Sequence, residues 1–138
     1  PNPINQYGKS KWEGEKYVQN ILNNYFIIRT SWLYHKKYGN NFYKKILEKA
    51  GKGEELRITD EQVGSPTNAD NLAKFILEFI VTNNQSFGIY HFTDGQAMSW
   101  YGFALKIVAE NGLKNTTIIV KDNNYRSFAR RPRISVLN

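Results

Sequence analysis

The chain has 138 residues, 41% of them hydrophobic, a composition that favours a single domain with a buried core. It contains no cysteine, which excludes disulfides, thiolate metal sites and cysteine nucleophiles, and its two histidines, His35 and His91, are too isolated to predict a metal site. The net charge of +7 favours an anionic partner.

The first half of the chain alternates between helical and extended patterns. Apolar residues within 9–23 recur with helical spacing, and an Asn-Asn pair ends the predicted helix. Residues 25–34, YFIIRTSWLY, are rich in β-branched and aromatic residues and predict a buried strand that runs into a loop. A second helix is predicted over 41–50, closed by a turn at 51–53, and a short strand over 55–59.

The second half continues the alternation. The predicted elements are a helix over 68–82, a strand over 89–93, a helix over 99–111 and a strand over 117–121, followed by an extended tail. Thr67 or Asn68 is expected to cap the first of these helices, and Ser99 the second. Strands alternating with helices indicate an α/β fold.

A glycine-rich loop for a dinucleotide phosphate is missing from this pattern. The ten glycines never form G-x-G-x-x-G. Gly51 and Gly53 have the first spacing, but Glu54 and Glu55 follow, and two carboxylates there would repel a phosphate. We therefore interpret this segment as the turn that ends a helix.

Tyr7 and Lys11 form a Tyr-x-x-x-Lys pair, which on a helix places both side chains on one face. A nearby ammonium favours the phenolate, so such a tyrosine can protonate a carbonyl oxygen while a hydride reaches the carbon. General acid catalysis of this kind contributes on the order of 10²–10⁴ in rate. However, a chain with 9 tyrosines and this many lysines has about one such pair by chance, so the pair alone also fits a surface tyrosine.

The residues around the pair resemble the active-site helix of extended short-chain dehydrogenases. The matching positions are Pro3, Asn5, Tyr7, Gly8, Ser10, Lys11 and Glu15. Further ordered blocks resemble the dTDP-4-dehydrorhamnose reductase family, namely 29–34, 39–42, 60–67, 88–91, 99–104 and 131–137. The resemblance spans nearly the whole chain. It implies the C-terminal part of a Rossmann-like extended short-chain dehydrogenase fold, including the substrate-binding region.

The resemblance also implies roles in catalysis and cofactor binding. Tyr7 would be the proton donor, and Lys11 would be its electrostatic partner and a ligand of the cofactor ribose. Thr30 and Ser31 follow the strand whose end meets the nicotinamide in this superfamily, so they are expected to contact NADPH, or NADH.

Candidate substrate-binding residues follow from the same resemblance. Trp32 would line the sugar pocket, because its flat apolar face suits the C–H edges of a deoxysugar, although it could instead fill the core. Asn41 could bind substrate or cap a helix, and Gln62 lies in a segment expected on the substrate side. Arg131 and Arg133 suit the pyrophosphate as bidentate donors, with solvated surface charge as the alternative.

The family's cofactor fingerprint lies upstream of the catalytic tyrosine, and only six residues precede Tyr7. We therefore expect a C-terminal fragment that is inactive by itself and lacks the glycine-rich half. It would comprise the active-site helix and strand, about 1–38, and the substrate-binding region, about 39–138.

The expected activity of the parent protein is reduction of the C4 ketone of dTDP-4-dehydro-6-deoxy-L-mannose with NADPH to dTDP-L-rhamnose, for cell-surface polysaccharide. Alternatives are another NAD(P)-dependent nucleotide-sugar epimerase or dehydratase, or a non-catalytic regulatory subunit on the same fold. The parent protein is a possible homodimer.

Nucleic acid and membrane partners are not expected. The aromatic residues lie mostly in predicted helices and strands, whereas a nucleic-acid site needs them interleaved with basic residues on one exposed face. No apolar stretch approaches the roughly 18 residues of a membrane span, and the N-terminal residues lack a signal-peptide pattern. A cytoplasmic location is expected.

Overall fold

A computed structural model of the chain describes residues 2–82 and 86–137, and its alternating helices and strands confirm the predicted α/β class. The first helix, α1 (Gln6–Ile21), begins earlier than its apolar spacing predicts. The reason is a cap: Asn5 Oδ1 accepts a hydrogen bond from the backbone N–H of Gly8 at 2.8 Å. No residue of α1 is fully buried.

The segment predicted as a strand that runs into a loop has this form, and a second, short strand follows the loop. β1 (Phe26–Arg29) pairs in parallel with β6 (Gly88–His91). β2 (Leu33–Tyr34) pairs in parallel with β5 (Thr67–Asn68). Between β1 and β2, Trp32 has a φ of 46°, in the left-handed region, where a regular strand cannot continue.

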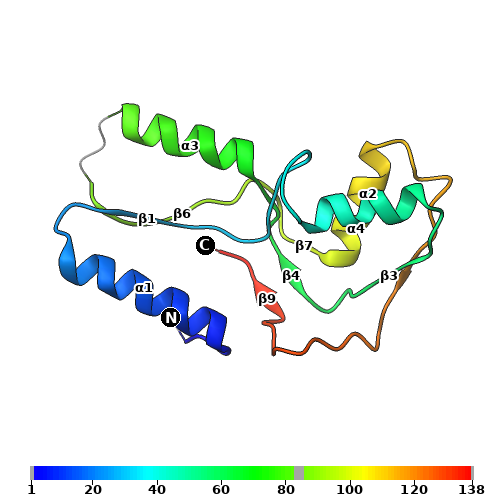
Figure 1. The fold of residues 1–138 in the computed structure, drawn as a ribbon, viewed down its shortest axis with the longest axis horizontal. Helices are drawn as coiled ribbons and strands as arrows, with labels where there is room; N and C mark the ends of the chain where they lie inside the picture. Colours follow the sequence, from blue (N-terminus) through cyan, green and yellow to red (C-terminus); the bar gives the residue numbers. More distant parts are fainter. Residues whose placement is uncertain (1, 83–85, 138) are drawn as a thin grey trace.

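Two helices lie on opposite sides of the β1–β6 pair (Figure 1). On one side, the rings of Phe26 in β1 and Phe79 in α3 (Ala69–Val81) meet edge to face, with centroids 4.9 Å apart. On the other side, the Arg29 side chain at the end of β1 donates to the carboxylate of Glu15 in α1. An aromatic contact therefore joins β1 to α3 on one side, and an ion pair joins β1 to α1 on the other.

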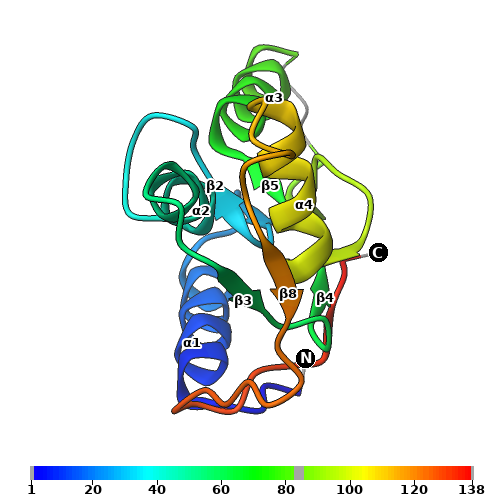
Figure 2. The ribbon, with the colours of Figure 1, turned by 90° about the vertical axis from the view of Figure 1, so that its right-hand side faces the viewer.

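The core lies in the other half of the fold, where two helices pack together beside a parallel strand pair (Figure 2). These elements are α2 (Phe42–Gly51), α4 (Trp100–Glu110), β3 (Leu56–Ile58) and β8 (Ile119–Lys121). Burying each large apolar side chain here contributes roughly 1.5–3 kcal/mol. The buried core residues are Tyr43, Ile46, Ala50, Leu56, Phe103, Ala104, Ile107 and Val108.

A small three-stranded sheet lies between the two halves (Figure 1). Its central strand, β4 (Val63–Gly64), pairs antiparallel with β7 (Met98–Ser99) and parallel with β9 (Ile134–Ser135). The sequence pattern predicts none of these strands, because two residues are too few to show a period. β9 brings the tail, predicted as extended, back to the centre of the molecule.

The predicted turn after α2 and the predicted cap and end of α4 agree with the structure. Ser99 caps α4, with its Oγ accepting from the N–H of Gly102 at 3.0 Å, and Gly112 follows with a φ of 71°. Gly53 has a φ of 70° after α2, which confirms the turn that ends this helix. As far as the chain is described, none of its helices is long and apolar enough to cross a membrane.

Candidate active site

The first turn of α1, the C-terminal tail and β4 are joined by two hydrogen bonds. The side-chain amide of Asn5 donates to the carbonyl oxygen of Arg130 at 2.8 Å. The backbone N–H of Val63 donates to the carbonyl oxygen of Arg133 at 2.7 Å. These contacts bring the predicted catalytic helix and the predicted phosphate-binding arginines to one end of the fold.

The loop after β1 is fastened to the same region. Ser31 Oγ donates to the carbonyl oxygen of Ser65 at 2.8 Å, and the N–H of Thr67 donates to the carbonyl oxygen of Trp32 at 3.2 Å. The predicted site residues from α1, the β1 loop, β4 and the tail therefore belong to one connected set of segments.

Tyr7 and Lys11 lie one turn apart on α1, and both side chains are accessible. The Tyr7 side chain is 72% exposed, and Lys11 Nζ lies 5.7 Å from the centroid of its ring. The N-cap at Asn5 fixes where the helix starts and so which face carries the pair. A phenol with an ammonium at this distance is equipped to donate a proton to a bound carbonyl.

Thr30 and Ser31 do not present free hydroxyls. Thr30 Oγ1 is buried and has no hydrogen-bond partner among the described atoms, and Ser31 Oγ is engaged by Ser65. Both residues lie in the loop between β1 and β2, and their contact with a cofactor stays a prediction.

Trp32 is half-buried and packs in the middle of the molecule. Its ring lies parallel to that of Trp100, at a centroid distance of 3.5 Å and an angle of 5°. It also contacts the buried core cluster. These contacts support the interpretation that Trp32 packs against the core, and its contact with a sugar stays a prediction.

Asn41 serves as the cap of α2. Its Oδ1 accepts from the N–H of Lys44 at 3.1 Å, and its amide donates to the carbonyl oxygens of His35 and Tyr38. The capping interpretation is confirmed. The amide is committed to the segment before α2, so a substrate would have to compete for it.

Gln62 and the tail arginines lie beside β4. Gln62 is half-buried and directly precedes the strand, whereas Arg131 and Arg133 are exposed. The backbone carbonyl of Arg133 accepts a hydrogen bond from the N–H of Val63, and this bond does not involve the guanidinium. Their binding of an anionic ligand stays a prediction.

Sequence reasoning missed two residues that shape this region, Gly64 and Trp100. A Cβ on Gly64 would lie 2.4 Å from Cε2 of Trp32, so the indole occupies the space of a side chain. Trp100 lies in the block 99–104 that carries the family resemblance, and no local pattern indicates its contact with Trp32. The signal for Gly64 is a glycine inside an extended segment, which often marks a close approach.

Glu15 and Arg29 form the best-defined ion pair of the region. Arg29 donates from Nε and Nη2 to the two carboxylate oxygens of Glu15, at 2.8 and 2.6 Å. These hydrogen bonds lower the pKa of Glu15 and raise that of Arg29, each against the opposing effect of partial burial. The pair orients α1 relative to the strand that leads to Trp32.

All of residues 1–138 match the family described as RmlD substrate binding domain. The chain belongs to this family. A dTDP-4-dehydrorhamnose reductase of Aggregatibacter actinomycetemcomitans is 35% identical to the RmlD domain over 147 aligned residues, covering 99% of this chain and 50% of that protein. The Bacillus subtilis spore coat polysaccharide biosynthesis protein SpsK is 36% identical and is covered to 47%.

The fold of the RmlD domain agrees with solved structures of similar proteins. The crystal structure of a Bacillus anthracis dTDP-4-dehydrorhamnose reductase in complex with NADP superimposes with a TM-score of 0.90 at 38% identity, covering 100% of this chain and 48% of that one. A Thermotoga maritima UDP-glucose 4-epimerase, at 17% identity and a TM-score of 0.73, shares the fold alone. The chain spans about half the length of the curated relatives it matches.

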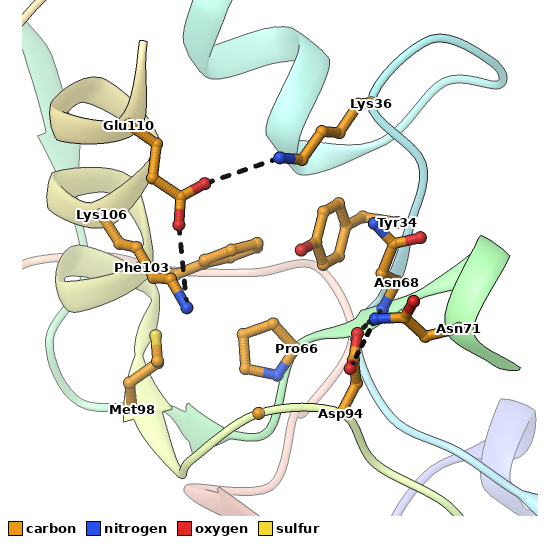
Figure 3. A pocket seen from close by; sticks show the side chains of 11 residues that line it. Tyr34, Lys36, Pro66, Asn68, Asn71, Asp94, Met98, Phe103, Lys106 and Glu110 are labelled. Atoms are coloured by element: carbon orange, nitrogen blue, oxygen red, sulfur yellow. Dashed lines mark hydrogen bonds and ion pairs between the residues drawn. The ribbon is translucent and has the colours of Figure 1, made fainter. Parts of the chain in front are cut away.

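The RmlD domain also has a hollow of about 250 Å³ that contains none of the site residues above (Figure 3). Lys36 and Lys106 flank Glu110 at 3.8 and 3.9 Å, and the hydroxyl of Tyr34 points inward. Burial, together with the charges of Asp94 and Glu110, raises the pKa of Tyr34. Nowhere in the described part do three or more His, Asp or Glu groups gather as a metal site requires.

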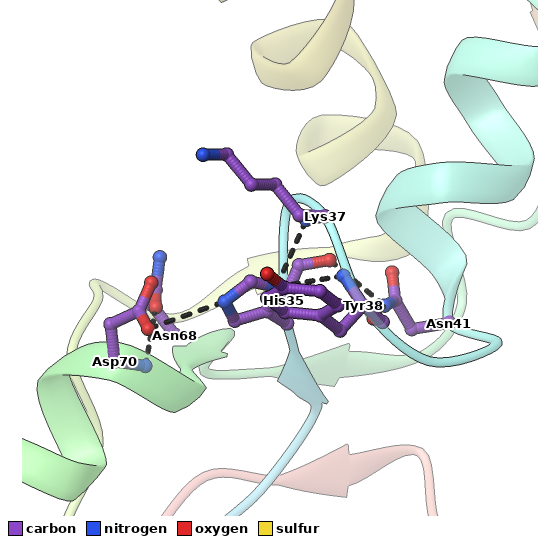
Figure 4. A network of polar contacts seen from close by, with 6 residues as sticks. All are labelled: His35, Lys37, Tyr38, Asn41, Asn68 and Asp70. Carbon is purple, nitrogen blue, oxygen red and sulfur yellow. Dashed lines mark hydrogen bonds and ion pairs between the residues drawn. The ribbon is translucent and has the colours of Figure 1, made fainter.

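A network of hydrogen bonds around His35 orders the segment that contains Lys36 (Figure 4). His35 Nδ1 accepts from the N–H groups of Lys37 and Tyr38 at 2.9 and 2.8 Å, and Nε2 lies 3.2 Å from Asp70 Oδ1. Since Nδ1 is an acceptor, Nε2 carries the proton and donates it to Asp70. His35 therefore links the loop before α2 to the first turn of α3 in the RmlD domain.

Proposed function

We propose that this chain is the substrate-binding half of a dTDP-4-dehydrorhamnose reductase, which reduces the C4 ketone of dTDP-4-dehydro-6-deoxy-L-mannose with NADPH to give dTDP-L-rhamnose. The observation that carries the proposal is the family match over all 138 residues, with Tyr7 and Lys11 accessible on one helix. Relatives named for this reductase at 34–36% identity, and one named for spore coat polysaccharide biosynthesis, support the reaction and its purpose.

The proposed chemistry needs one proton and one hydride. Tyr7 donates its phenolic proton to the C4 carbonyl oxygen as the hydride bonds to C4, so the carbonyl becomes a hydroxyl. The phenolate that remains is stabilised by the ammonium of Lys11 until Tyr7 regains a proton from solvent. Asn5 holds the first turn of α1 and thereby the position of Tyr7.

The residues present fit the nicotinamide end of NADPH or NADH. When bound, the reduced nicotinamide supplies the hydride. Lys11 is exposed and offers donors for ribose hydroxyls. Thr30 has a buried hydroxyl and Ser31 an engaged one, so we expect the loop after β1 to meet the cofactor through its backbone. The phosphates would be bound by a glycine-rich half that this sequence does not include.

The nucleotide-sugar would lie between Trp32 and the tail. The half-buried Trp32 would contribute an apolar surface to the sugar site. Arg131 and Arg133 are exposed, and their guanidinium groups can form paired hydrogen bonds to pyrophosphate oxygens. Gln62 directly precedes β4, whose first residue, Val63, pairs with Ile134 beside Arg133.

Two other functions are less well supported. The epimerases that share the fold are only 17–22% identical, which supports the architecture but not their reaction. A regulatory subunit would not need Tyr7 and Lys11, and both are present and accessible.

Cytoplasmic action fits the absence of cysteine, and a homodimer of the full-length protein stays a prediction that its mass in solution would test.

The test is an assay of the full-length protein with dTDP-4-dehydrorhamnose and NADPH. We expect one NADPH to be oxidised for each dTDP-L-rhamnose formed, with the product identified by NMR. Interconversion of two nucleotide-sugars without net oxidation of NADPH would instead establish an epimerase. Binding of sugar nucleotide without any turnover would favour the regulatory subunit.

A further inference from the structure

The side-chain amide of Asn5 joins two parts of the chain that are far apart in sequence. Its Oδ1 accepts from the backbone N–H of Gly8 at 2.8 Å and so caps α1. Its Nδ2 donates to the backbone carbonyl of Arg130, also at 2.8 Å, across 125 positions, where the tail runs beside the start of α1 (Figure 2). The two partners fix the orientation of the amide, because an N–H needs its oxygen and a carbonyl needs its nitrogen.

Gly8 leaves the space that this arrangement needs. A Cβ at Gly8 would lie 3.1 Å from Cβ of Pro3 and 3.3 Å from Oδ1 of Asn5. Both distances are shorter than an ordinary van der Waals contact. The missing side chain therefore lets Pro3 and the Asn5 amide pack directly on the first turn of α1.

The tail is anchored a second time, three residues further on. The N–H of Val63 in β4 donates to the carbonyl of Arg133 at 2.7 Å. The short segment from Arg130 to Arg133 thus bridges from α1 to the central sheet, and the exposed Arg131 and Arg133 lie on it. Three residues of chain reach at most about 11 Å, so the backbone of both arginines stays near the carbonyl that Asn5 holds.

We propose that Asn5 is a positioning residue that sets the distance between Tyr7 and the arginines of the tail, so that a sugar nucleotide held by its pyrophosphate presents its ketone to the proton donor. This proposal rests on the proposed function. The substrate must meet both groups at once, because its pyrophosphate and its C4 carbonyl belong to one molecule of limited length. Without the hydrogen bond from Asn5, the tail would have to be ordered when the substrate binds, and this ordering costs binding free energy.

The first test compares Asn5→Asp and Asn5→Ser in the full-length protein. Asp and Ser cap helices about as well as Asn does. However, an aspartate carboxylate has no donor, and the shorter serine cannot reach the tail while it caps the helix. Both variants should raise the KM for the sugar nucleotide about three- to tenfold, the worth of one hydrogen bond. The KM for NADPH, kcat and the melting temperature should change little.

Two further variants separate this effect from charge and from helix capping. Gln6→Glu adds a negative charge at an exposed neighbouring position and should leave the KM for the sugar nucleotide near its wild-type value. Asn5→Ala loses both hydrogen bonds and should also lower kcat, because the first turn that carries Tyr7 loses its cap. If Asn5→Ser leaves KM unchanged, or if the loss in Asn5→Asp and Asn5→Ser is confined to kcat, the proposal is wrong.

A combined variant tests whether Asn5 acts through the tail arginines. In a background that carries both Arg131→Gln and Arg133→Gln, Asn5→Asp should add no further increase in the KM for the sugar nucleotide, because the groups that it positions are already gone. Additive increases would show that Asn5 acts by another route and would overturn the proposal.

Limited trypsin digestion tests the contact without any substrate. Trypsin cleaves after arginine, and the carbonyl that would be attacked after Arg130 is the one that Asn5 holds. Asn5→Asp and Asn5→Ser should therefore speed cleavage between Arg130 and Arg131 about three- to tenfold, relative to cleavage after Lys52 in the turn behind α2. An unchanged ratio would refute the contact. If the ratio rises but the wild-type full-length protein shows no reductase activity, the contact is right and the proposed function is wrong.

Discussion

At the residue scale, the main feature is the solvent-exposed side chain of Tyr7. The helix cap at Asn5 holds the first turn of α1, which carries Tyr7. Tyr7 is 72% exposed, which is high for a large aromatic residue. An exposed tyrosine beside Lys11 contributes little to packing. Its removal is therefore expected to change chemistry rather than stability.

Replacing Tyr7 with Phe in the full-length protein should lower kcat by on the order of 10²–10⁴, because one proton donor is lost. The KM for the sugar nucleotide and the melting temperature should change little, since the ring and its helix remain. Steady-state kinetics and a thermal melt measure both. The matched control is Tyr17→Phe, an exposed tyrosine on the same helix. A Tyr7→Phe enzyme with nearly normal kcat would remove Tyr7 from the mechanism.

The candidate site residues could be predicted from the sequence, but their contacts in the fold could not. Tyr7, Lys11 and Trp32 can be selected from motif resemblance, because the types and spacings are written in the chain. That Trp32 stacks on Trp100, or that it occupies the space of a side chain at Gly64, depends on residues far apart in sequence. No local pattern encodes such a contact.

At the element scale, α1 is tied to β1 by Glu15 and Arg29. Arg29 hydrogen bonds lower the pKa of Glu15, so the pair stabilises the fold fully above the ordinary glutamate pKa. That contribution is lost as the pH falls through the lowered pKa of the folded state. The relevant window lies below about pH 4.

Glu15→Gln should therefore destabilise the full-length protein by about 1 kcal/mol at neutral pH and progressively less toward acid, where the wild-type carboxylate is itself protonated. Thermal melts of both proteins between neutral pH and about pH 3 measure the difference. Glu13→Gln is the control, because the Glu13 carboxylate is exposed and its nearest cation, Lys9, is 4.0 Å away. A difference between Glu15→Gln and wild type that does not shrink in acid would contradict the assigned role.

Elements also differ in how well the sequence predicts them. The four helices could be predicted, because apolar spacing and the caps at Asn41 and Ser99 are local signals. The two-residue strands β4, β7 and β9 could not, because each exists only through its partners. The start of α1 was missed because its first turn has a cap but no apolar period.

At the scale of the whole molecule, the two halves of the fold differ in how many side chains they bury. The core lies around α2 and α4, whereas α1 has no fully buried residue. Tyr17, Ile21 and Leu22 on or next to α1 are 69%, 75% and 49% exposed. This exposed apolar surface of α1 is available for packing against the proposed glycine-rich half of the full-length protein.

The isolated chain is therefore expected to show no oxidation of NADPH above background with dTDP-4-dehydrorhamnose. The physical reason is that it offers Tyr7 and Lys11 but no glycine-rich loop for the cofactor phosphates. The full-length protein in the same assay is the control, and circular dichroism confirms that the isolated chain is folded. Turnover by the isolated chain would overturn the fragment interpretation.

The bond from Asn5 to the carbonyl of Arg130 has a kinetic consequence. It joins residues 125 positions apart, so its closure has a high entropic cost, and we expect it to form late in folding. During synthesis, α1 leaves the ribosome long before its partner in the tail exists. The core around α2 and α4 can form first, and the segment that carries Arg131 and Arg133 docks last. Synthesis must reach the tail before the region around Tyr7 is assembled, so a chain truncated before β9 would fold in part and still lack its substrate site.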